Sequence, residues 1–134
     1  MSIAELLDED NIDYTTSSAV NGEGKMRHFI DTKAAVDESV VFDVRFIATE
    51  EWVGLHTVAV SLKSLSSSKR NQVLQAVALS QSERHLVRFC EVQDMLFAEA
   101  RWPAIDSEVN REQYEFALHT VLQAAFDLHQ ALEN

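Results

Sequence analysis

Five histidines and a single cysteine are the residues of this chain best suited to binding a metal or acting as a nucleophile. The histidines are His28, His56, His85, His119 and His129. No two of them stand four residues apart, the spacing that places two histidine ligands on one helix face, and no cysteine accompanies them at ligand-like intervals. The pattern predicts exposed or strand-face histidines and no metal site.

Cys90 would need an activating histidine to serve as a nucleophile. It stands between Phe89 and Val92 in an expected strand, which predicts a buried, inert thiol. Gly22 and Gly24 form a lone Gly-x-Gly without the strand-to-helix context of a phosphate-binding loop, and the sequence contains no nucleophile elbow or Walker-type lysine. We therefore predict no catalytic residue and no cofactor.

One enzymatic alternative stays open, because a site can be assembled from residues that are far apart in the sequence. His56, Glu91 and Arg88 are candidates for such a site. A pocket with a histidine of perturbed pKa and a convergent carboxylate would indicate a small-ligand protein or an enzyme. A broad apolar patch on a helix or on the sheet would instead indicate a binding module.

Four aromatic residues are candidates for contacting a protein partner, namely Trp52, Trp102, Phe116 and Phe126. Each tryptophan lies at one end of an expected strand, where an indole serves either as a lid on the core or as an interface anchor. The two phenylalanines lie off the main apolar stripe of the last helix. That helix is therefore apolar on more than one side, which indicates a second packing partner.

The formal charge of −11 is concentrated at the two ends of the chain. Residues 1–13 carry five acids and no base, and residues 106–134 carry six acids and only Arg111. Such a field repels phosphate backbones, so nucleic-acid binding is disfavoured. It favours solubility, or the steering of a basic or amphipathic protein segment. The single cysteine, the lack of a secretory signal and the lack of an apolar run of about 18 residues predict a cytoplasmic protein that does not enter a membrane.

Two hydrophobic periods divide the chain into strands and helices. The expected elements are a short helix at residues 2–7, strands near 26–30, 41–48 and 52–62, a helix at 69–80, strands at 85–92 and 95–102, and a helix over 106–134. Residues 11–24, rich in Ser, Thr, Asn and Gly, read as a loop or a weak first strand. The predicted core residues are Phe42, Val44, Phe46, Val58, Val60, Leu74, Val77, Leu118, Val121, Leu122 and Leu128.

The last helix has a start signal of its own. Asn110 can cap it, Gln113 can reach back to the Asn110 amide, and Val109 can pack on Tyr114 as a hydrophobic staple. Together these patterns predict an α/β (α+β) fold of two layers. A mainly antiparallel five-stranded sheet, in the order helix, three strands, helix, two strands, helix, carries the last helix across one face. We expect one domain over 1–134, with 25–134 as its core and 1–24 as a short helix followed by a loop or weak strand.

This order of elements, with the passage 98–114 (AEARWPAIDSEVNREQY) leading into the last helix, resembles the secretion-chaperone-like fold. It is most similar to the YbjN-type bacterial proteins, described as sensory-transduction regulators, and next to the small acidic chaperones of type III secretion. The strand at 58–62, the helix at 66–79 and the junction at Trp102 and Pro103 carry the resemblance. The short first helix departs from the longer client-binding segment of the type III chaperones.

The resemblance implies a non-enzymatic homodimer that acts through protein contacts. We therefore expect a chaperone-like or regulatory protein-binding module, whose partners are a second copy of the chain and an unidentified protein client.

Overall fold

The computed structural model describes residues 1–37, 39–83 and 86–133. Three residues that belong to predicted segments lie outside the described residues. They are Glu38 in an expected turn, His85 at the start of the expected strand 85–92, and Asn134 at the end of the expected last helix. The elements, in chain order, are α1 (Ile3–Glu9), β1 (Tyr14–Val20), β2 (Met26–Ala35), β3 (Val41–Ala48), β4 (Trp52–Ser61), α2 (Ser67–Glu83), β5 (Arg88–Val92), β6 (Met95–Pro103) and α3 (Arg111–Ala131).

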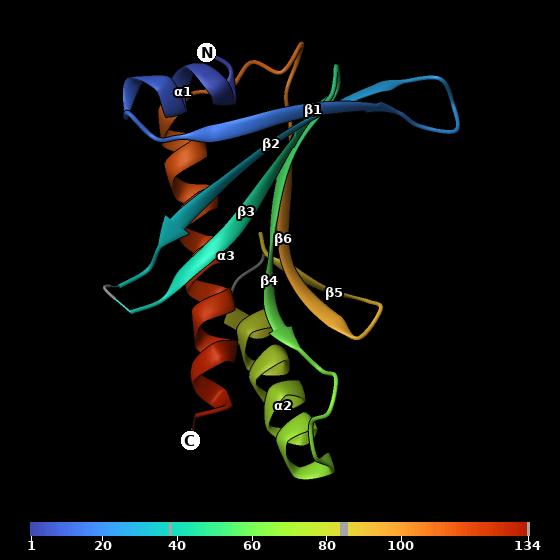
Figure 1. The fold of residues 1–134 in the computed structure, drawn as a ribbon, viewed down its shortest axis with the longest axis vertical. Helices are drawn as coiled ribbons and strands as arrows, with labels where there is room; N and C mark the ends of the chain where they lie inside the picture. The colour runs from blue at the N-terminus through green and yellow to red at the C-terminus, as the bar shows by residue number, and fades with distance from the viewer. Residues whose placement is uncertain (38, 84–85, 134) are drawn as a thin grey trace.

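The strands form one antiparallel sheet in the order β1-β2-β3-β4-β6-β5 (Figure 1). The predicted α+β class and antiparallel sheet are confirmed, but the count of five strands is wrong, because β1 adds a sixth. Its Ser- and Thr-rich sequence has no apolar alternation and therefore no strand period. It forms a strand because all seven of its residues pair with β2.

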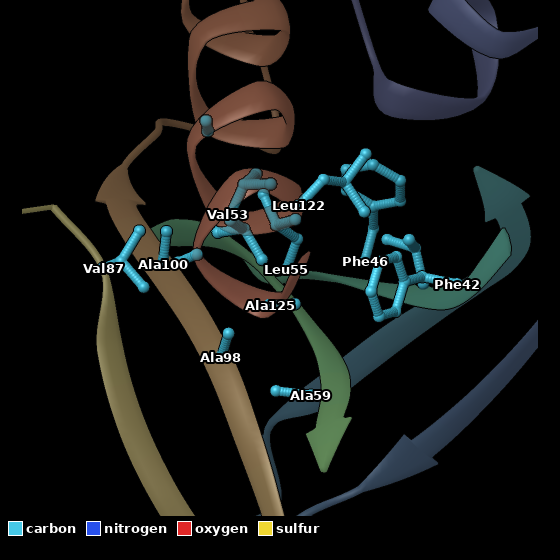
Figure 2. Packing of buried hydrophobic residues seen from close by; sticks show 14 of the residues in the cluster. Phe42, Phe46, Val53, Leu55, Ala59, Val87, Ala98, Ala100, Leu122 and Ala125 are labelled. Carbon is cyan, nitrogen blue, oxygen red and sulfur yellow. The ribbon is translucent and has the colours of Figure 1, made fainter. Parts of the chain in front are cut away.

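The core lies between the sheet and α3, which runs over β4 and β6. Figure 2 shows side chains of β3, β4 and β6 packed beneath this helix, with alanines of β6 and α3 allowing a close approach. The confirmed core residues are Phe42, Val44, Phe46, Val60, Val121, Leu122 and Leu128. Leu118 and Val77 are partly buried at the margin of the same cluster.

The predicted N-cap of α3 is confirmed, but the predicted return bond from the Gln113 side chain to the Asn110 amide does not occur among the described hydrogen bonds. The Oδ1 of Asn110 accepts the Gln113 amide at 2.8 Å, and Val109 and Tyr114 are both buried. The helix begins at Arg111 rather than at residue 106. Asp106 and Ser107 adopt left-handed backbone angles, φ 52° and 64°, which interrupt a right-handed helix.

The predicted core role of Val58 is wrong, because a β-bulge in β4 turns its side chain away from the core. Pairing with β6 shifts register between Val58 and Val60. Before the shift, Thr57 points into the core and Val58 points out; after it, Val60 and Leu62 point in. The Thr57 hydroxyl is satisfied in the core, because its Oγ1 donates to the Asp43 carbonyl at 2.7 Å.

The predicted core role of Leu74 is wrong, because its side chain is 60% exposed. Helix α2 packs mainly against α3 and buries only Val73 and Ser80 fully. Helix α2 lies beside the lower end of α3 (Figure 1), so most of its apolar stripe does not face the sheet.

The short N-terminal helix belongs to the same core as the rest of the chain. Ile3, Leu6 and Leu7 are almost fully buried in the main cluster. Ser2 and Glu5 form a capping box that fixes the start of α1. The Arg111 guanidinium binds the carboxylates of Glu9 and Asp10 and so ties α1 to the start of α3.

Candidate functional site

The face of the sheet that points away from α3 forms the candidate site, and we call it the open face. Along each strand, buried residues alternate with more exposed ones. Helix α3 covers the opposite face of the sheet, α1 packs into the same core, and α2 packs against α3. Register places both apolar and charged side chains on the open face. Its charged groups are Arg27, Asp31, Lys33, Asp43, Arg45, Arg88, Glu99 and Arg101. Five of these are cationic and three are carboxylates, and a fourth carboxylate, Asp13, lines the same face at the start of β1, so the described part of this face is net basic by one charge in a chain of charge −11.

A row of directly paired residues crosses five strands at the centre of the open face. The pairs are Asp31 with Arg45, Arg45 with His56, His56 with Glu99, and Glu99 with Arg88. We call these five residues the charged row. Opposite charges on neighbouring strands stabilise a sheet pair. The row therefore supports the sheet as well as placing polar groups on its surface.

Within the charged row, Arg45 and Asp31 form a bidentate ion pair. The Nε and Nη2 of Arg45 donate to the two carboxylate oxygens of Asp31, at 2.7 and 3.0 Å. This pairing lowers the pKa of Asp31 and raises that of Arg45. The guanidinium also lies 4.8 Å from the ring centre of Phe29, a cation–π distance. Arg45 thus contacts both Asp31 and Phe29 at the centre of the face.

His56 is the one histidine of the row. Its ring meets Phe97 edge-on, with 5.2 Å between centres. Burial and then the charge of Arg45 lower its pKa below the ordinary value of 6.5, and Glu99 and Asp31 oppose this shift. His56 and Arg45 line an open concavity of about 770 Å³, bounded by the start of β1 and by β2, β3, β4 and β6. At neutral pH the row presents a neutral imidazole to this concavity.

We expect the free energy of unfolding to fall as the pH drops through the range just below 6.5. In that range the unfolded chain binds a proton at His56 that the folded chain does not, so acid favours unfolding. The variant His56→Gln lacks this proton and should show a shallower dependence on pH there. Urea unfolding at a series of pH values measures both curves, and identical slopes for the two proteins would contradict this account of His56.

A second cluster lies beside the charged row, where the guanidinium groups of two arginines lie over the ring of Trp52. The guanidinium carbon of Arg101 lies 3.8 Å from the Trp52 ring centre, and that of Arg27 lies 5.5 Å away. We call these three residues the Arg–Trp platform. Within the described residues, neither arginine forms an ion pair with a carboxylate. Both charges therefore remain available to a partner.

Glycine at position 54 makes the Arg–Trp platform possible. A Cβ on Gly54 would lie 3.2 Å from Cζ3 of Trp52 and 3.1 Å from the Ala100 carbonyl oxygen. Both distances are tighter than ordinary contacts, so the indole occupies the space that a side chain would take. Arg101 pairs directly with Gly54 in the register, which explains why its guanidinium reaches the same ring.

The structure separates the four aromatic candidates from one another. Trp52 lies on the open face, half-buried beneath its arginines. Trp102 is only 8% exposed and belongs to the core, where its Nε1 has no hydrogen-bond partner among the described residues. Phe116 is 63% exposed on α3, and Phe126 is partly buried against the main cluster. Among the four, Trp52 is the one over whose ring the described residues place two guanidinium groups.

The scattered residues proposed for a ligand site come together in part. His56 and Arg88 both lie in the charged row, but the carboxylate between them is Glu99, which accepts from Nη2 of Arg88 at 2.8 Å. Glu91 pairs with Leu96 and so points to the other side of the sheet. No cluster of His, Cys, Asp or Glu suited to a metal ion occurs in the described ranges.

The prediction of a buried Cys90 is wrong, because the thiol is exposed. Cys90 pairs with Phe97 and lies on the open face of the edge strand β5, where no layer covers it. The apolar neighbours in its sequence belong to a short strand whose residues are mostly exposed. Local composition therefore gave no sign of this exposure.

Comparison with known proteins establishes the fold only. No protein-family model matches the chain, and no curated protein matches it. The crystal structure of an uncharacterized protein from Methanothermobacter thermautotrophicus is similar, with a TM-score of 0.60 and 13% sequence identity, over 98% of this chain and 94% of that one. Within the described residues, no helix combines the length and apolarity needed to cross a membrane.

Proposed function

We propose that this chain is a non-enzymatic, cytoplasmic protein-binding module, chaperone-like or regulatory, that receives a segment of its client on the open face. The observation that carries the proposal is the Arg–Trp platform, with two guanidinium groups stacked on the indole of Trp52 and no carboxylate partner among the described residues. Tryptophan and arginine are among the residue types most enriched at the centres of protein interfaces.

The client segment should be acidic and amphipathic. The acidic ends of the chain favour a basic segment, but the described part of the open face carries five cationic groups against four carboxylates, and the two arginines of the Arg–Trp platform have no carboxylate partner there. A carboxylate of the client can accept two hydrogen bonds from each free guanidinium. Its apolar side chains can pack against Phe97 and Val58, which line the neighbouring concavity. The Arg–Trp platform thus favours acidic side chains of the client, and the concavity favours its apolar side chains.

Selection of random peptides displayed on phage tests this proposal with a defined probe. We expect wild-type protein to enrich peptides that combine Asp or Glu with large apolar residues. Trp52→Ala should weaken their binding about thirtyfold, because truncation of an interface hot spot costs about 2 kcal/mol or more. Phe116→Ala is the matched control, since it removes an exposed aromatic from α3 and should leave binding unchanged.

Three results would overturn the proposal. Enrichment of basic peptides would show that the acidic ends, and not the open face, select the client. An equal loss in Phe116→Ala would place the site on α3. Failure of the library to enrich any sequence, with nucleic acid bound in its place, would remove the protein-binding function itself.

A small-ligand protein is the second candidate, and one observation favours it. His56 has a lowered pKa and shares the charged row with the carboxylates of Asp31 and Glu99, beside a concavity of about 770 Å³. Ligand pockets commonly have volumes of about 300–1,000 Å³. A metabolite that copurifies with the protein and is lost in His56→Gln would favour this candidate over the binding module.

A further inference from the structure

The strand β1 forms one edge of the sheet and lacks the features that usually protect an edge. It pairs with β2 on one side only, so alternate backbone N–H and C=O groups of Tyr14–Val20 point outward. Protected edges are short, bulged, or interrupted by charge or proline. β1 has seven residues in unbroken register, with no charge, no proline and no glycine.

The rest of the molecule makes β1 the favoured place for two copies to meet. Each copy carries a charge of −11, so most pairs of surfaces repel one another. β1 contributes no charge to such a contact. The opposite edge, β5, is shorter, with five residues, and carries Arg88 and Glu91. The β1–β2 hairpin also projects beyond the remaining strands (Figure 1), which leaves β1 accessible to a second hairpin.

The sequence of β1 is complementary to itself in an antiparallel pair. With the two-fold axis at Ser17, Tyr14 of one copy lies opposite Val20 of the other, and Thr16 lies opposite Ser18. Aromatic pairs with β-branched residues and hydroxyl pairs both stabilise neighbouring strands. Val20 is 59% exposed in the single chain, and this register would place it beside the partly buried Tyr14 of the other copy.

We infer that two copies of this chain associate through β1, in antiparallel register about Ser17, to form one continuous twelve-stranded sheet. The contact is isologous, so it closes after two copies. It leaves the open face of each copy free, and it stands or falls independently of the client proposed for that face.

Complementary charges at the two-fold axis test this inference. Ser17→Lys places two ammonium groups opposite each other and Ser17→Glu two carboxylates, so each variant should be monomeric by light scattering at concentrations where the wild type is a dimer. An equimolar mixture of the two variants should recover the dimer, because lysine then faces glutamate. Misfolding cannot explain recovery on mixing.

Cross-linking tests the register. In a Cys90→Ser background, Ser17→Cys should form a disulfide-linked dimer on mild oxidation, since residues opposite each other in a ladder have Cα atoms about 4.5–5.5 Å apart. Ser18→Cys is the control, because two copies of residue 18 are offset along the strands by roughly 7 Å and lie beyond disulfide reach. A monomeric wild type at high concentration would overturn the inference. So would charge variants that all remain dimeric together with a Ser17→Cys variant that forms no cross-link.

Discussion

Replacement of Phe46 by alanine is expected to lower the free energy of unfolding by about 3–5 kcal/mol, the range for truncation of a fully buried aromatic ring. Phe46 is 0% exposed at the centre of the core, and its ring lies 5.8 Å from that of Tyr114 on α3. The cavity would therefore open between the sheet and the helix that covers it (Figure 2). Urea unfolding followed by circular dichroism measures the change.

Leu74→Ala is the matched control for Phe46→Ala. The sequence predicts both residues in the core, but Leu74 is 60% exposed on α2. Its truncation should change the free energy of unfolding by no more than about 0.5 kcal/mol, as is usual for surface positions. Comparable losses in the two variants would mean that α2 packs against something other than α3, and would contradict the packing described for this chain.

Removal of both arginines from the Arg–Trp platform is expected to weaken binding of an acidic peptide by about a hundredfold or more. A hydrogen bond to a charged group contributes about 1.5–3 kcal/mol, and Arg27→Ala with Arg101→Ala removes at least two such bonds. Fluorescence anisotropy with a labelled peptide selected on the wild-type protein measures the affinity. The fold should be unaffected, because neither guanidinium has an ion-pair partner among the described residues to leave unpaired.

Salt separates the electrostatic part of this binding from the apolar part. Raising the salt concentration should slow association more than it speeds dissociation, since charges steer the encounter and buried apolar contacts hold the complex. Lys63→Ala, in the turn that follows β4, removes a positive charge away from the open face. It should have little effect on affinity. A loss in Lys63→Ala as large as in the double variant would mean that overall charge, and not the platform, governs binding.

The parts of the fold that could be predicted are those whose signal is local. The alternation in 41–48 predicts β3, and the cap at Asn110 predicts the start of α3, because each depends on neighbours within a few residues. β1 could not be predicted as a firm strand, because its Ser and Thr residues gain strand structure only from pairing with β2. The bulge that turns Thr57 inward depends on register against β6, about 40 residues away.

The candidate site was less predictable than the fold for the same reason. The sequence singles out His56, Arg88 and Trp52 as candidates, but it does not single out Glu99 or Arg101, although their residue types are equally suited. Which residues share a row is decided by the pairing of five strands, and no short window of sequence contains that information. The strands did contain one useful signal, because their charged residues alternate along the chain with the apolar residues that face the core.

The docking of α1 against α3 has a consequence for the chain as it is made. The groups that hold α1 in place, beginning with Arg111, follow Asp10 by about 100 residues. At a synthesis rate of about 5–20 residues per second, Ile3, Leu6 and Leu7 emerge from the ribosome roughly 5–20 seconds before their binding site exists. During that interval the first helix is a free apolar segment. It is therefore open to capture by a folding factor until the start of α3 has been made.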